Sequence, residues 1–193
     1  MPSFRTTCRV KHTPQQMFDL VADVEKYPLF LPLCEGLRVR SRAPSESGRE
    51  TLIANMTVGY KAIRETFTSK VVLDRAASKI AVTYLNGPFR ALDNIWTFKP
   101  DGQGCLVEFF ISYEFKNRML GMLMGTMFDR AFRKFSEAFE RRAEVVYGRV
   151  APSGLAGGTV AGRRRFAQGP QERTQHHSVT HRGSRTRRPI SRA

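Results

Sequence analysis

The 193-residue chain contains few cysteines and no long apolar run. Cys8, Cys34 and Cys105 are widely spaced and odd in number, which argues against a disulfide-linked scaffold and favours a reducing compartment. No stretch of about 18 apolar residues is present, so we expect no membrane-spanning helix. The first ten residues, MPSFRTTCRV, lack the apolar segment of a signal peptide, and we therefore expect a cytoplasmic location.

The sequence also lacks recognisable catalytic and metal-binding motifs. It contains no phosphate-binding glycine loop, no zinc-ligand pattern and no nucleophile elbow. His12 is the single histidine before residue 149, and its position between an expected strand and an expected helix is typical of an exposed loop residue. Cys34 lies in an apolar segment without a nearby histidine, which favours an inert, packed thiol. These observations favour a protein that is not an enzyme and holds no metal.

The positive charge is unevenly placed along the chain. The net charge is +15, with 22 basic and 16 acidic residues in 1–148 but 10 basic and one acidic residue in 149–193. The second segment is rich in Gly, Ser, Thr, Pro and Arg, so it cannot bury enough apolar surface to fold. We therefore expect a domain at 1–148 and a disordered basic tail at 149–193. The tail either binds RNA or anionic lipid or is a solvated extension without a partner.

Periodicity within residues 1–148 predicts an α+β fold. A strand is expected at 3–11, followed by a helix that begins at Thr13, with Pro14 in the first turn and Gln16 completing a capping box. This helix is expected to end at Tyr27, because the residue before Pro28 avoids helical geometry. Six strands are expected next, at 35–43, 49–59, 62–74, 78–85, 89–99 and 105–115, and then a long helix at about 119–147. Such grouping predicts an antiparallel sheet with one buried face.

Alternation and helical spacing identify the buried faces. In the last strand, Val107, Phe109, Ile111, Tyr113 and Phe115 share one face. The apolar stripe of the long helix is expected to comprise Met124, Phe128, Ala131, Phe132, Phe135, Phe139, Ala143 and Val146. One helix on one curved sheet rarely fills the space between them, so a cavity is plausible there.

Three features point to a site in or near such a cavity. The segment YPLFLPLC at 27–34 holds two prolines four residues apart, so it either plugs a core or forms a cavity wall. Glu65 and Asn94 each share a face with apolar neighbours. Each of them contacts either a ligand or another protein group. The segment 119–128 is apolar on nearly all sides, which implies a second contact with another subunit, a flexible ligand or a membrane surface.

Four stretches carry a resemblance to a known family. DVEKYPLFLPLC resembles the signature of the START-like family that includes the coenzyme Q-binding proteins and the ribosome association toxins. The likeness continues in GYKAIRETFTSKV, GPFRALDNIWTF and VEFFISYEFKNRMLGMLMGTMFD and spans about residues 3–147. It implies a helix-grip fold, in which a curved seven-stranded antiparallel sheet wraps around the long C-terminal helix and encloses a hydrophobic tunnel. Leu33 replaces the tryptophan that many relatives carry beside the cysteine.

The resemblance implies non-catalytic binding of ubiquinone, a polyprenyl quinone, as a carrier or chaperone for respiration or quinone biosynthesis. It implies peripheral association with the inner membrane, and the alternative within the family is a ribosome-binding translation inhibitor that acts on RNA through the basic surface. A tunnel enzyme such as a cyclase would need a positioned acid or base, for which Glu65 is the candidate. The expected ligand-binding residues are Tyr27, Phe30, Leu31, Pro32, Cys34, Tyr60, Glu65, Asn94, Trp96, Phe98, Tyr113, Met119, Met122, Leu123, Met127 and Phe128.

Overall fold

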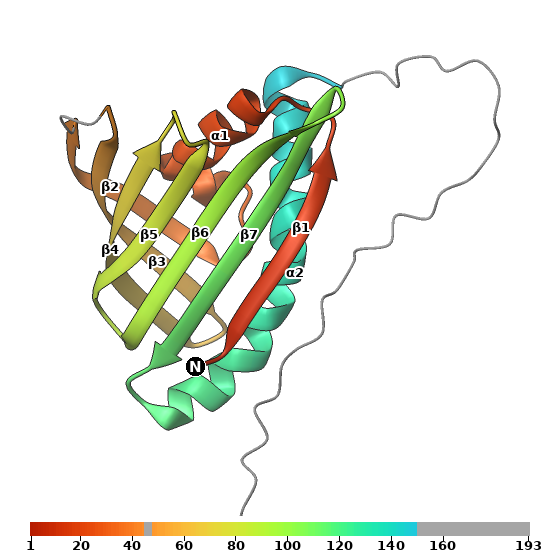
Figure 1. Cartoon of the computed structure of the whole chain (residues 1–193). Coiled ribbons are helices and arrows are strands. Elements are labelled where there is room, and N and C mark those ends of the chain that lie inside the picture. The colour runs from red at the N-terminus through yellow and green to blue at the C-terminus, as the bar shows by residue number, and fades with distance from the viewer. Residues whose placement is uncertain (45–47, 150–193) are drawn as a thin grey trace, which may run out of the picture.

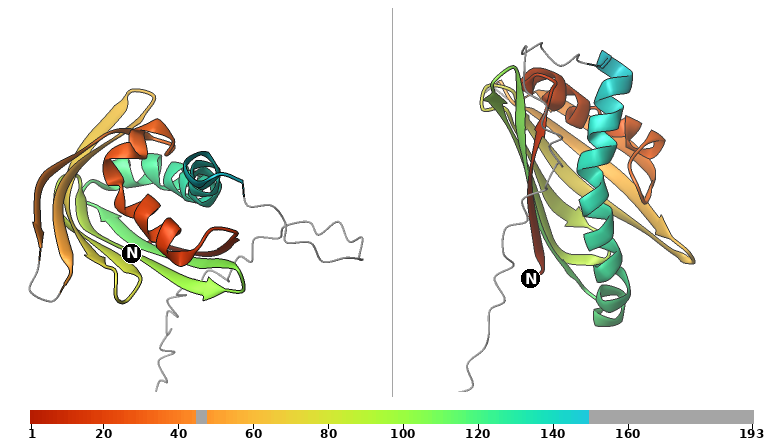
Figure 2. Two further views of the ribbon diagram at one scale, coloured as in Figure 1. Left: turned by 90° about the horizontal axis from the view of Figure 1, so that it is seen from above. Right: turned by 90° about the vertical axis from the view of Figure 1, so that its right-hand side faces the viewer.

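The computed structural model describes residues 1–44 and 48–149, without the side chains of residues 123–129. The basic tail expected at 149–193 therefore lies outside the described residues, except for Arg149. Within the described part, a curved antiparallel sheet wraps around one long helix (Figures 1 and 2). The predicted α+β helix-grip class with seven strands is confirmed.

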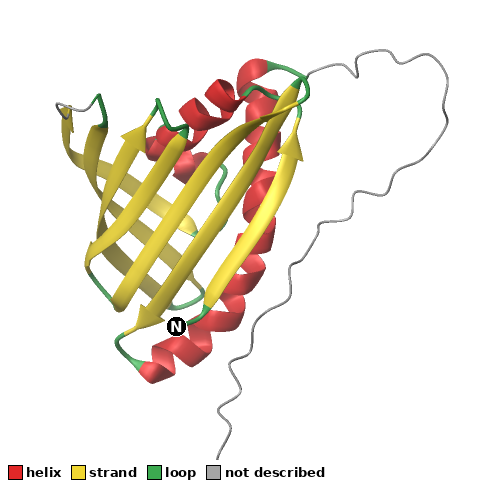
Figure 3. Cartoon of the chain, in the orientation of Figure 1, coloured by secondary structure: helices red, strands yellow, loops and turns green. Residues whose placement is uncertain are grey.

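The chain order explains the sheet order. The strands lie in the order β1-β7-β6-β5-β4-β3-β2, so six consecutive strands form a meander and the first strand pairs with the last one. Figure 3 shows both helical segments before the meander and the long helix after it on the concave side of the sheet. The elements are β1 (Ser3–Val10), α1 (Pro14–Ala22), the 3-10 helix η1 (Val24–Leu29), β2 (Cys34–Pro44), β3 (Glu50–Tyr60), β4 (Ile63–Asp74), β5 (Lys79–Asn86), β6 (Phe89–Asp101), β7 (Gly104–Phe115) and α2 (Arg118–Tyr147).

Helix α1 begins as the sequence predicts but ends earlier. The Thr13 side chain accepts a hydrogen bond from the Gln16 backbone, and the Gln16 side chain accepts one from the Thr13 backbone, so the capping box is confirmed. The expected end at Tyr27 is wrong, because α1 stops at Ala22 and η1 follows. The Tyr27 hydroxyl donates a 2.6 Å hydrogen bond to the Val21 carbonyl, which a continuing α-helix would have used internally.

The alternation of buried and exposed residues along the strands is confirmed. In β7 the predicted inward residues Val107, Phe109, Ile111, Tyr113 and Phe115 are all buried. Their neighbours face solvent on the convex side, where Glu108 pairs with Lys99 at 2.8 Å. The core therefore lies between the concave face of the sheet and the helices, which is where the sequence placed it.

Helix α2 supplies the other half of this core. Its N-cap is Asn117, whose side-chain oxygen accepts a hydrogen bond from the Met119 backbone at 2.8 Å. Phe132 and Phe139 are buried as predicted, and Phe135 is half-buried. The prediction that Val146 belongs to the buried stripe is wrong, because its side chain is 47% exposed and Tyr147 packs inward instead. Met124 and Phe128 lie among the side chains that are not described.

His12 is not an exposed loop residue, and this prediction is also wrong. Its side chain is only 2% exposed. The Nε2 atom donates a hydrogen bond of 3.1 Å to the carbonyl of Gly148, at the C-terminal end of α2. The imidazole therefore ties the start of α1 to the end of α2, while its Nδ1 atom is buried without a partner among the described residues.

Candidate ligand-binding cavity

A cavity of about 130 Å³ lies between the concave face of the sheet and α2. Phe132, Phe135 and Phe139 close it from α2, and Val21 and Val24 close it from the α1–η1 region. The other lining residues come from the segment after η1 and from the strands: Tyr27, Leu31, Pro32, Leu33, Leu37, Ala54, Met56, Val58, Phe67, Ser69, Val71, Ile80, Val82, Phe89, Leu92, Asn94, Trp96, Phe109, Ile111 and Tyr113. Apolar side chains dominate the lining, and phenylalanine is its most frequent residue.

The proline-containing segment forms a wall of this cavity. Tyr27, Leu31, Pro32 and Leu33 all line it. Leu33 has a positive φ of 66°, which is unfavourable for a residue with a branched side chain. Its carbonyl accepts a 3.0 Å hydrogen bond from the Gly59 backbone, which fixes the segment to the end of β3. Of the two alternatives for this segment, the structure therefore favours the cavity wall.

Tyr27 is held rigidly and stays neutral. Its hydroxyl donates to the Val21 carbonyl, and burial raises its pKa well above the ordinary value. Its ring lies edge-on to Phe139 at 5.4 Å and to Phe30 at 5.8 Å. Tyr27 therefore contributes an apolar ring face to the site, and its hydroxyl is occupied by the backbone.

Trp96 forms a second aromatic surface of the cavity. Its ring lies 4.5 Å from Phe109 and 5.1 Å from Phe139, and it stacks at 6.4 Å on Phe98. It is the only tryptophan in the chain. Since its side chain both lines the cavity and fluoresces, it provides a direct probe of any ligand that enters.

Asn94 is a polar residue of the lining whose side chain has one atom without a hydrogen-bond partner in the described part of the chain. Its side chain is 9% exposed, and its Oδ1 atom has no hydrogen-bond partner among the described residues. Its neighbours across the adjacent strands are Val82 and Ile111, which cannot supply one. A buried, unsatisfied carbonyl costs about 1–3 kcal/mol. Oδ1 can accept from a ligand hydroxyl, and a half-turn of the amide presents its NH₂ group to a ligand carbonyl instead.

The structure brings six of the predicted site residues together around the cavity, namely Tyr27, Leu31, Pro32, Asn94, Trp96 and Tyr113. Phe30 and Phe98 pack just behind the wall, against Phe139 at 5.2 Å and Phe18 at 5.8 Å respectively. Cys34 is buried beside the wall, and burial raises the pKa of its thiol to about 11, so the thiol is protonated at neutral pH. This protonation agrees with an inert, packed cysteine.

The remaining predicted residues lie away from the cavity. Glu65 is half-buried near the start of β4, opposite Val58, and has no ion-pair partner among the described residues. Tyr60 is exposed, with the Lys61 ammonium 5.4 Å above its ring. Met119 and Met122 were expected in the lining, but their side chains are exposed to solvent. Leu123, Met127 and Phe128 lie outside the described side chains.

Sequence reasoning missed most of the lining, both the residues from the two helical regions and those from strands β2 to β5. Phe132, Phe135 and Phe139 belong to the predicted apolar stripe of α2, but the stripe alone does not distinguish a cavity wall from a packed core. Val21 and Val24 belong to the apolar stripe of the first helical region, which is equally compatible with a cavity wall and a packed core. Only the three-dimensional gap between helix and sheet separates these two cases.

Two further searches of the described residues complete the description of the site. No cluster of three or more His, Cys, Asp or Glu side chains there is arranged to hold a metal ion. None of the described helices has the length and apolar character needed to cross a membrane.

The chain belongs to the family described as polyketide cyclase / dehydrase and lipid transport, which residues 10–140 match. The fold supports this assignment. A START superfamily protein from Mycobacterium smegmatis is 20% identical, covers 75% of this chain and 98% of its own, and superposes with a TM-score of 0.63. This likeness confirms the fold that the sequence motifs imply.

Two curated relatives are more similar in sequence. The ribosome association toxin RatA of Escherichia coli K12 is 34% identical over 148 residues, which is 76% of this chain and 90% of the toxin. The mitochondrial coenzyme Q-binding protein COQ10 homolog B of Xenopus laevis is 30% identical over 139 residues, which is 70% of this chain and 55% of that protein. Neither name states an enzymatic reaction.

Proposed function

We propose that the cavity holds the ring and the adjoining isoprenoid carbons of a polyprenyl quinone such as ubiquinone. In this proposal the protein is a non-catalytic carrier or chaperone that serves respiratory electron transport or quinone biosynthesis at the inner-membrane surface. The observation that carries the proposal is a ring-sized apolar cavity whose wall includes one buried amide, Asn94, without a partner.

The size of the cavity supports a ring rather than a long tail. An engineered apolar cavity of about 150 Å³ accepts one benzene molecule, and the volume here is about 130 Å³. The volume matches one unsubstituted six-membered ring or one short isoprenoid piece, so the walls must move apart to admit the methoxy-substituted ring of ubiquinone. The rest of a polyprenyl tail therefore extends beyond the cavity, or the walls move apart to admit it.

The chemistry of the lining supports binding without catalysis. Among the described side chains, the lining includes no carboxylate, histidine or lysine, so these residues provide no general acid or base near neutral pH. Asn94 and Ser69 are its buried polar side chains besides the tyrosines. An amide suits a neutral quinone, because it donates to a ring carbonyl or accepts from the hydroxyl of the reduced form. The name of the Xenopus relative points to the same ligand.

Two measurements test this proposal. Organic extraction of the full chain, purified from a quinone-producing host, should release ubiquinone, and native mass spectrometry should detect the complex. Titration with ubiquinone that carries a single isoprenoid unit should quench Trp96 fluorescence saturably, because the ring would lie against this side chain. A quinone-free extract combined with no saturable quenching would refute the proposal.

Association with the ribosome is a second candidate function. The relative from Escherichia coli is named for that role, and this chain has a net charge of +15. Arg38 and Lys70 are exposed on the convex face of the sheet and have no ion-pair partner among the described residues, so they are available to phosphates.

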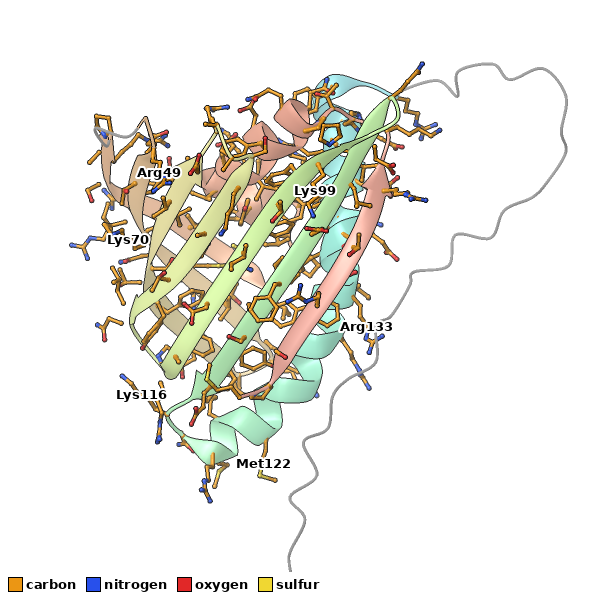
Figure 4. The ribbon with its side chains drawn as sticks, viewed as in Figure 1. Arg49, Lys70, Lys99, Lys116, Met122 and Arg133 are labelled. Carbon is orange, nitrogen blue, oxygen red and sulfur yellow. The ribbon has the colours of Figure 1, made fainter. Side chains whose placement is uncertain are left out.

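Co-sedimentation with purified ribosomal subunits over a range of KCl concentrations tests this second candidate. Binding should fall steeply with salt, and the Arg38→Glu/Lys70→Glu variant should weaken it more than the single, distant Arg133→Glu control does. Figure 4 shows Lys70 and Arg133 on different sides of the molecule. Absence of co-sedimentation even at low salt would exclude ribosome association.

A further inference from the structure

The antiparallel order of the sheet brings several separate segments to one end of the molecule. The start of β1, the β3–β4 and β5–β6 turns and the corner between β7 and α2 must all lie there, because neighbouring strands alternate in direction. The Lys116 backbone donates a 2.9 Å hydrogen bond to the Pro88 carbonyl, which joins two of these segments. Figure 1 shows the chain start and the start of α2 at this end. We call residues 1–3, 59–64, 85–90 and 115–122 the basal end.

Exposed apolar side chains gather at the basal end. Eight large apolar residues of the described chain are exposed, and five of them lie here: Met1, Tyr60, Leu85, Met119 and Met122. Met119 is 71% exposed and Met122 is 80% exposed, although both begin a helix whose later turns are packed. In Figure 4 the Met122 side chain lies at this end of the molecule. Water-exposed methionines in such a group imply a contact that the isolated chain does not provide.

The same end carries unpaired positive charge. Lys61, Lys116 and Arg118 are exposed and have no ion-pair partner among the described residues. Two of the carboxylates nearby are engaged, since Glu35 pairs with Arg64 at 2.9 Å and Glu114 pairs with Arg90 at 3.5 Å. Glu65, next to this end, is unpaired among the described residues, so the three cations still leave a net positive charge. Cations and apolar side chains are therefore both exposed at the basal end. This arrangement is typical of surfaces that bind anionic lipid headgroups and the upper acyl chains together.

We propose that the basal end docks on the surface of an anionic phospholipid bilayer. Met119 and Met122 insert among the upper acyl carbons, and Lys61, Lys116 and Arg118 contact lipid phosphates. A bilayer fits better than a protein partner because one surface of it offers both phosphates to the unpaired cations and acyl carbons to the exposed methionines. The docking is independent of which ligand occupies the cavity, so it stands or falls separately from the proposed quinone binding.

Oxidation of the native methionines tests the docking directly. The full chain is treated with dilute hydrogen peroxide, and mass spectrometry of its peptides gives an oxidation rate for each methionine. Vesicles of equal parts phosphatidylcholine and phosphatidylglycerol should slow oxidation of Met119 and Met122 at least about tenfold, whereas vesicles of phosphatidylcholine alone should not. This readout is specific to the basal end, so binding of the basic tail to the same vesicles does not imitate it.

Sedimentation with the same vesicles adds matched variants. Met119→Ser/Met122→Ser should weaken partitioning by about tenfold or more, because two apolar side chains no longer insert. The control Val145→Ser/Val146→Ser changes two exposed apolar residues at the opposite end of α2 and should have no effect. Lys116→Glu/Arg118→Glu should weaken partitioning by at least about 25-fold at low salt, at about fivefold per cation. Its control is Lys70→Glu/Arg133→Glu, which removes equal charge elsewhere.

The outcomes separate the alternatives. Docking is supported if the vesicles protect both methionines from oxidation and if only the basal-end variants lose vesicle partitioning. Unprotected methionines, or equal partitioning of the basal-end and control variants, would overturn it and assign vesicle binding to another surface. Protection that rises with protein concentration in the absence of vesicles would also overturn it, because the basal end would then contact a second copy of the chain.

Discussion

Replacing Ala54 with leucine fills part of the cavity from the protein side. Ala54 is 3% exposed and lines the cavity from β3. A void of 130 Å³ represents about 3 kcal/mol of lost packing at about 24 cal/mol per Å³. Three added carbon atoms gain about 2.4 kcal/mol at about 0.8 kcal/mol each, reduced by about 0.5–1 kcal/mol of lost rotamer freedom. We expect the free energy of unfolding to rise by about 1.5 kcal/mol.

Urea unfolding, followed by Trp96 fluorescence and circular dichroism, measures this change. The melting temperature should rise by about 3–6 °C, given about 2–4 °C per kcal/mol for a protein of this size. The same variant should bind short-chain ubiquinone at least about tenfold more weakly, because the new side chain occupies the volume of the ring. The matched control is Ala81→Leu on the convex face, where we expect a change within about 0.5 kcal/mol and unaltered binding.

Two results would contradict the reasoning in different ways. If Ala54→Leu lowered the free energy of unfolding by more than about 1 kcal/mol at an unchanged denaturant slope, the site would be overpacked and no void would exist. If the stability rose while quinone affinity stayed the same, the void would exist but would not be the ligand site.

Two further predictions concern single groups of the cavity wall, and a third concerns two buried thiols. Asn94→Leu should raise the free energy of unfolding by about 1–3 kcal/mol, because it removes an unsatisfied amide. The same variant should weaken quinone binding about two- to tenfold in the Trp96 quenching assay. Equal affinity would show that Asn94 does not contact the quinone. Tyr27→Phe should cost about 1 kcal/mol in urea unfolding, since the Val21 carbonyl loses its donor, and an unchanged midpoint would contradict this role. Burial raises the pKa of Cys34 and Cys105 from the ordinary 9.0 to about 11, so their contribution to stability is complete below pH 9 and is lost as the pH rises to 11. Alkaline unfolding of Cys34→Ala/Cys105→Ala should therefore show a smaller fall over that range than the wild type.

Local sequence signals predicted the fold because they record which side of each element is buried. Alternation in residues 105–115 and the stripe that includes Phe132 and Phe139 each survive in the structure with the expected faces inward. Antiparallel order then follows from the short turns between strands. The boundaries of the strands differ from the expected ones by one or two residues, as fraying ends usually do.

The predictions that failed depend on contacts between residues far apart in the sequence. His12 is buried because it lies against Gly148, which is 136 residues further along the chain and accepts its hydrogen bond. At the early end of α1, the Tyr27 hydroxyl donates a hydrogen bond to the Val21 carbonyl. The sequence does not reveal which acceptor this hydroxyl contacts. Met119 and Met122 carry the apolar signal of a lining, but the start of α2 lies beyond the end of the sheet, where nothing described covers them.

The energetics of the cavity favour reversible holding of the ligand. The tail of a polyprenyl quinone gains as much in the bilayer as in an apolar protein site, so that gain cancels when the ligand transfers between them. In the proposed quinone complex, the protein would offer beyond the bilayer a filled void, worth about 3 kcal/mol, and one hydrogen bond to Asn94, worth about 1 kcal/mol. The sum corresponds to a preference of about a thousandfold at most over the membrane. A preference of this size permits both uptake and release, which a carrier requires and a storage protein does not.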